Sequence, residues 1–121
     1  MLNIIIMTNK TINSPRELVN HLINIFPAFV QEWDEGEGFG VKGHYTYHVV
    51  FLTFGSESRT LLNKATTNQI EEFCALINYA VKKGGELENA VSTCFLEHAT
   101  QLGVLNMIKR CLSVKAKGEL H

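Results

Sequence analysis

Residues 66–85 read TTNQIEEFCALINYAVKKGG, and this stretch decides the fold class. Thr66 stands three residues before Gln69, which is the spacing of a capping box at a helix start. At the other end two lysines precede Gly84 and Gly85, and cations followed by glycine are typical of a helix end. Between these signals the apolar residues recur at helical spacing. They are Ile70, Phe73, Cys74, Ile77 and Val81. The stretch therefore predicts one amphipathic helix.

Downstream of this helix the same pattern continues. Residues 86–100 carry acidic residues in their first turn and apolar residues at helical spacing, which predicts a second helix, and Gly103 is placed to end it. Leu105, Ile108 and Leu112 predict a last helix. Residues 115–121 are expected to form a disordered tail, as chain ends often do.

Upstream, Ser14 and Pro15 mark a helix start, because Ser14 can cap the first turn and proline has no amide hydrogen to leave unpaired there. Pro27 removes a backbone hydrogen bond further along, so it should end this helix and begin a second short one over residues 27–33. Residues 1–12 are expected to be an apolar arm or tail.

Residues 44–54 fit two structures. Tyr45, Tyr47, Val49, Phe51 and Thr53 alternate as in a strand. The same segment also places apolar residues on one helical face, and we expect a helix. The predicted fold is all-α: a compact stack of five to six helices in antiparallel pairs, in a single domain over residues 1–121. The alternative is an α+β fold with a short two-stranded ribbon from residues 2–7 and 45–54.

Composition excludes several classes of function. The 121 residues carry 11 Lys and Arg against 12 Asp and Glu, a net charge of −1, so no general field favours nucleic acid or an acidic membrane surface. No apolar run reaches the roughly 20 residues of a membrane span. Residues 2–7 lack the features of a signal peptide. Three widely spaced cysteines in apolar surroundings predict reduced thiols and a cytoplasmic protein.

Two motifs carry a resemblance to a known group of proteins. Phe26-Pro27-Ala28-Phe29 with Trp33, and Asn89-Ala90-Val91-Ser92-Thr93-Cys94-Phe95-Leu96-Glu97, resemble a family of small uncharacterised bacterial helical proteins. Some such proteins resemble immunity proteins of toxin systems, and this implies a binding role without established chemistry. Glu97 is the polar member of the second motif. We expect it to be partly buried, where it would cap a neighbouring helix or pair with Arg16 or Arg59.

An acidic segment follows the first two predicted helices and is the best candidate for an interface. It combines four carboxylates in six positions with two aromatic residues, as protein interfaces with a charged rim do. The candidate partner-binding residues are Glu32, Trp33, Asp34, Glu35, Glu37 and Phe39. We expect a protein partner with a basic surface, such as a toxin domain whose active site binds a polyanion. The competing interpretation is a solvated loop with Trp33 in the core.

Two further hypotheses come from other parts of the chain. His44 and His48 are four residues apart, which places both rings on one face of a helix, and Glu97 would add a third metal ligand. No other metal-binding motif accompanies them, so we expect neither a metal nor another cofactor. No nucleophile and base are arranged for catalysis, and we expect a protein that is not an enzyme. The last hypothesis is a homodimeric regulatory or scaffold subunit that pairs through residues 2–7.

Overall fold

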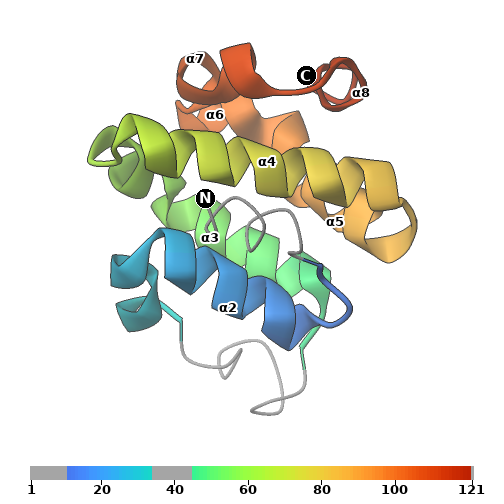
Figure 1. Cartoon of the computed structure of the whole chain (residues 1–121), viewed down its shortest axis with the longest axis horizontal. Coiled ribbons are helices and arrows are strands. Elements are labelled where there is room, and N and C mark those ends of the chain that lie inside the picture. Colours follow the sequence, from blue (N-terminus) through green and yellow to red (C-terminus); the bar gives the residue numbers. More distant parts are fainter. Residues whose placement is uncertain (1–10, 34–44, 121) are drawn as a thin grey trace, which may run out of the picture.

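The computed structural model describes residues 11–33 and 45–120, and over these two ranges the chain forms helices and no strand. The predicted all-α fold is confirmed. Figure 1 shows α4 (Thr67–Lys83) across the middle of the molecule. The helix α2 (Pro15–Ile25) lies on one side of it, and α7 (Leu105–Ile108) and α8 (Val114–Lys117) lie on the other. Within the described ranges no helix is both long and apolar enough to cross a lipid bilayer.

The first helix begins as the sequence predicts. The side chain of Ser14 accepts a hydrogen bond from the backbone N–H of Glu17, and the Glu17 carboxylate accepts one from the N–H of Asn13. The helix ends at Phe26, and the 3-10 helix η1 (Pro27–Gln31) follows. Pro27 therefore separates the two elements, as predicted.

Residues 47–54 are helical, so the two-stranded ribbon predicted as the alternative is wrong for this segment. The helix α3 (Tyr47–Asn63) begins with Thr46, whose side chain accepts from the N–H of Val49 at 3.2 Å. Its buried side chains include Val50, Phe51 and Phe54, which share a helical face. Burial of that face outweighs the strand propensity of the segment. The proposed partner strand and the apolar arm, residues 2–7, lie outside the described residues.

The capping box of α4 is present as predicted. Thr66 and Gln69 exchange hydrogen bonds between side chain and backbone, at 2.7 and 3.1 Å. Gln69 also donates from its amide to the carbonyl of Ile25 at 2.8 Å, which ties the start of α4 to the end of α2. Gly84, with φ of +78°, ends α4 and leads directly into α5 (Gly85–Cys94).

The helix predicted over residues 86–100 is broken at Phe95, which is a correction. The helix α5 ends there, and η3 (Leu96–His98) and α6 (Ala99–Leu102) follow before Gly103, whose φ is +78°. Phe95 has φ of −133° and is fully buried. Its ring lies 5.5 Å from that of Phe73 and 6.0 Å from that of Phe54, between centroids. Packing of this ring outweighs the local helical pattern.

The C-terminal residues are ordered up to residue 120, contrary to the disordered tail predicted for residues 115–121. The helix α7 is followed by η4 (Lys109–Cys111), and α8 begins with Ser113, whose hydroxyl accepts from the N–H of Ala116 at 3.1 Å. Ala116 is fully buried, and α8 contacts α4. A single small apolar residue among lysines gave no periodic signal, so the sequence did not reveal this contact.

The cysteine prediction is also wrong for two of the three residues. Cys74 on α4 and Cys111 on η4 form a disulfide, with their Cα atoms 5.8 Å apart, and Cys94 is free. The two residues lie 37 positions apart in sequence. They meet because the chain turns at Gly103 and packs back on α4. Spacing in the sequence gave no indication of this return.

Candidate functional site

Three helices begin at the same end of the molecule. Figure 1 shows the first turns of α2, α3 and α5 there, beside the last turn of α4. The first turn of α2 contains Glu17, and the first turn of α5 contains Glu86 and Glu88. Carboxylates are favoured near helix N-termini, because the backbone N–H groups there carry partial positive charge. The helix starts therefore gather acidic side chains at this end.

The carboxylates at the helix starts affect the pKa of Tyr47. Burial raises the pKa of its hydroxyl, and the carboxylates of Glu17 and Glu86 raise it further. Lys83 is the cation at the end of α4, and its ammonium donates to the carbonyl of Ile12 at 2.7 Å and to the side chain of Asn13 at 2.9 Å. These acceptors are neutral. The charges that face Tyr47 from α2 and α5 are therefore negative.

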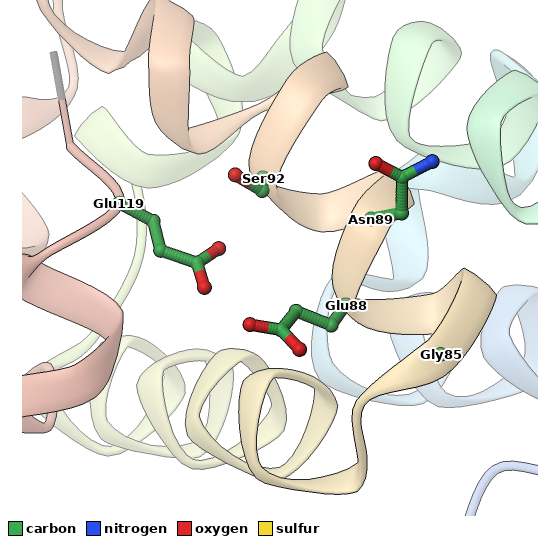
Figure 2. Close-up of a pocket in the computed structure, with 5 residues that line it drawn as sticks. All are labelled: Gly85, Glu88, Asn89, Ser92 and Glu119. Carbon is green, nitrogen blue, oxygen red and sulfur yellow. The ribbon is translucent and has the colours of Figure 1, made fainter.

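A polar pocket of about 220 Å³ opens beside the start of α5. Its lining consists of Gly85, Glu88, Asn89, Ser92 and Glu119. Figure 2 shows the carboxyl groups of Glu88 and Glu119 pointing toward each other, one from α5 and one from the chain after α8. The pocket therefore brings together two carboxyl groups that lie 31 residues apart in the sequence.

The surroundings of Glu119 favour its protonated form. Burial raises the pKa of Glu119, a hydrogen bond with Glu88 raises it further, and a hydrogen bond with Ser92 and the charge of Lys115 act in the opposite direction. Like charges at short range disfavour double ionisation, so a proton or another cation stabilises the pair. The pocket is suited to a cationic group.

Only His48 and Glu97 of the alternative metal site lie in the described part of the chain, so that site stays a prediction. His44 lies outside the described residues. The ring Nε2 of His48 lies 3.2 Å from the amide nitrogen of Asn89, which engages the atom that would bind a metal. Glu97 is exposed on η3 instead of partly buried, because the break at Phe95 turns it away from the core. In residues 11–33 and 45–120 no three potential ligands come together.

The predicted partner-binding residues lie mostly outside the described part of the chain. This holds for Asp34, Glu35, Glu37 and Phe39. Glu32 is described and exposed. Trp33 is only 8% exposed, and its ring contacts Phe29 at 6.2 Å and Tyr45 at 4.9 Å between centroids. The indole therefore belongs to the core, where a partner does not reach it.

The contact between Trp33 and Tyr45 joins the residues on either side of residues 34–44, to which most of the acidic segment belongs. Trp33 is the last described residue before residues 34–44, and Tyr45 is the first after them. Their rings meet edge to face, with an interplanar angle of 77°. Both flanks of the segment are thus fixed to the helical body.

The sequence missed the carboxylate pocket. Glu88 and Ser92 are four residues apart on α5, so their common face could have been recognised from helical spacing. Glu119 could not, because it lies in the segment predicted to be a disordered tail. The pairing depends on the return of the chain after Gly103.

Comparison with known proteins gives a family and no characterised relative. No curated protein and no solved structure matches the chain. Residues 19–117 match a family model described as a domain of unknown function, DUF7674. This range contains both motifs on which the resemblance rests and the complete helical core from α3 to α8. The chain belongs to this uncharacterised domain family, DUF7674.

Proposed function

We propose that this protein is a binding module that recognises a basic protein partner through an acidic surface. The surface comprises the segment from Glu32 to Glu37 and the carboxylates at the helix starts. One observation carries the proposal: Glu17 and Glu86 both act on Tyr47, two residues after the chain returns from the acidic segment at Tyr45. We therefore add these described carboxylates to the acidic residues predicted for the interface.

Charge complementarity gives such a surface a physical advantage. A concentration of negative charge speeds the encounter with a positively charged partner and disfavours acidic competitors. The net charge of the chain is only −1, so this effect depends on local clustering. A toxin domain that binds a polyanion has the required basic surface. The match between this acidic surface and a basic toxin domain suggests that the protein acts as an immunity protein in the cytoplasm.

The fixed flanks of the acidic segment support the same proposal. Binding costs free energy when side chains must be ordered, and packed residues beside an interface lower this cost. Trp33 and Tyr45 provide such a fixed base, because both rings pack on the helical body. Trp33 would then support the interface from the core and would not contact the partner itself.

Affinity purification from the cells of origin tests the proposal. The test variant is Glu32→Gln with Asp34→Asn, Glu35→Gln and Glu37→Gln. The control variant makes the same change of four charges elsewhere, at Glu57, Glu71, Glu72 and Glu97. We expect the wild type and the control to retain one stoichiometric basic protein, and the test variant to lose at least about 90% of it. Equal retention by both variants, or the absence of any stoichiometric basic partner, would contradict the proposal.

A further inference from the structure

Residues 105–120 form a cover on one side of α4, which we call the C-terminal cover. It consists of α7, η4, α8 and the three residues after α8, and each of its helical elements contacts α4. Ile108 and Ala116 are fully buried and Leu112 is 5% exposed. Figure 1 shows the cover running along the side of α4 that faces away from α2. The cover therefore shields part of the apolar surface of α4.

Polar and covalent contacts concentrate at one point of this cover. The disulfide joins Cys111 to Cys74 on α4. One turn further along α4, the amide of Asn78 donates to the carbonyl of Cys111 at 3.2 Å, and its oxygen accepts from the N–H of Ser113 at 2.8 Å. One covalent bond and two hydrogen bonds thus hold Cys111 and Ser113 of the cover to α4.

The two cysteines of the disulfide differ in exposure. Cys74 is 1% exposed and lies on the buried face of α4. Cys111 is partly exposed, at the point where the chain leaves η4. Thiol exchange requires an incoming thiolate to reach one sulfur in line with the bond. Cys111 is the more exposed of the two residues, so we expect the attack at its sulfur.

The aromatic part of the core contains no residue of the cover. Four phenylalanine rings pack together with successive centroid distances of 5.5, 5.1 and 5.5 Å. They are Phe26, Phe54, Phe73 and Phe95. These rings come from the end of α2, from α3, from α4 and from the residue after α5, and none belongs to residues 105–120. The body of the molecule therefore has an aromatic core of its own.

We propose that the Cys74–Cys111 disulfide is a redox latch, which a dithiol reductant opens at Cys111 to release the C-terminal cover from α4. A disulfide that opens in this way is of the transient, redox-sensing kind. The latch does not rest on the partner binding proposed above, although Glu119 of the cover lies opposite Glu88 of the acidic surface. Its open state exposes apolar residues of α4 and of the cover, while the aromatic core stays folded.

The latch opens by thiol–disulfide exchange in two steps. One thiolate of the reductant attacks the sulfur of Cys111, the disulfide bond breaks, and Cys74 leaves as a thiolate and takes up a proton. The second thiol of the reductant, as thiolate, then attacks the sulfur of the reductant in the mixed disulfide. Cys111 is released and takes up a proton. Two electrons and two protons pass from the dithiol to the protein, and the reductant becomes a cyclic disulfide.

Hydrogen exchange of the wild-type protein, measured by mass spectrometry with and without dithiothreitol, tests the latch. Alkylation under denaturing conditions first establishes the state of each cysteine. We expect Cys74 and Cys111 to be blocked before reduction and alkylated after it. We expect amide exchange in residues 109–120 to accelerate by about tenfold or more on reduction, and exchange in α2 and α3 to change less than about twofold.

Three results would overturn the proposal. If both cysteines are alkylated before reduction, the disulfide does not form in solution. If exchange in the cover does not change, the disulfide does not hold it. If α2 and α3 accelerate as much as the cover, the disulfide stabilises the whole domain and is not a latch.

Single cysteine variants test the direction of attack, in a Cys94→Ala background that removes the third thiol. With Cys74→Ser the free thiol is Cys111, and with Cys111→Ser it is Cys74. We expect Cys111 to react with glutathione disulfide at least about tenfold faster than Cys74, because of its exposure. Comparable rates in two variants with native circular dichroism would contradict attack at Cys111. If either variant fails to fold, digestion of the wild type after brief reaction with a monothiol shows which cysteine carries the mixed disulfide.

Discussion

Glu88 and Glu119 face each other across a pocket although one lies on α5 and the other follows α8. Burial raises the pKa of Glu119, and a hydrogen bond with Glu88 raises it further. The protonated form of Glu119 is therefore favoured in the folded protein relative to the unfolded chain. Its contribution to stability is complete below the ordinary glutamate pKa and is lost as the pH rises through the raised value.

Glu119→Gln should stabilise the protein at neutral pH. The amide keeps a hydrogen-bond donor toward Glu88 and removes the repulsion between two carboxylates. Because the pair is partly exposed and screened by solvent, the gain should stay below about 1 kcal/mol at pH 7.5 and vanish near pH 4. Urea unfolding at both pH values measures the difference. Glu97→Gln, on an exposed carboxylate, is the control, and an equal gain in that variant would refute the assignment to the pair.

Local signals made the helix starts predictable. Ser14 and Thr66 act as caps within one turn of the residues that they bind, so the sequence alone contains the complete interaction. The same holds for Pro27 and for the end of α4 at Gly84. Each of these features depends on residues fewer than five positions apart.

Features that depend on distant contacts were not predictable. The break at Phe95 depends on aromatic rings from α3 and α4, the disulfide on the return of the chain to α4, and the pocket on Glu119. Burial of Trp33 depends likewise on Tyr45, across residues 34–44. The candidate site was therefore found only in part, because its carboxylate pair is a tertiary contact.

Trp33→Ala should destabilise the protein strongly. The change removes a buried indole and its contacts with Phe29 and Tyr45, and such truncations cost about 3–5 kcal/mol. Trp33→Phe keeps an aromatic ring, so it should cost less than half as much. Equilibrium unfolding in urea gives both values, with Val30→Ala as the control at an exposed apolar residue. A loss below about 0.5 kcal/mol for Trp33→Ala would contradict the burial of this side chain.

Gln69→Glu should separate the two roles of this side chain. The carboxylate keeps an oxygen to accept from the N–H of Thr66, but it cannot donate to the carbonyl of Ile25. We expect a loss of about 1–2 kcal/mol in the whole protein, because a charge-bearing acceptor then faces a carbonyl. An isolated peptide of residues 64–85 should keep its helicity, since glutamate suits the first turn. Reduced helicity in the peptide would assign the loss to the cap instead.

Replacing glycine by alanine should change the stability of the protein in opposite directions at Gly103 and at Gly55. Gly103 has φ of +78°, and a Cβ atom there would lie 3.4 Å from the side chain of Arg59. Alanine in that backbone conformation should cost about 1 kcal/mol or more. Gly55 lies inside α3, where a Cβ atom would meet Leu102 and the carbonyl of Cys94 at the ordinary distances of 3.6 and 3.7 Å.

Gly55→Ala should therefore stabilise the protein by about 0.5–1 kcal/mol, because alanine is the better helix former and the space is sufficient. Thermal unfolding of both variants against the wild type gives the two signs in one experiment. The same small side chain is added in each case, so the difference reports only the backbone conformation and the neighbouring atoms. A destabilised Gly55→Ala would mean that α3 packs against Leu102 and Cys94 more tightly than these distances allow.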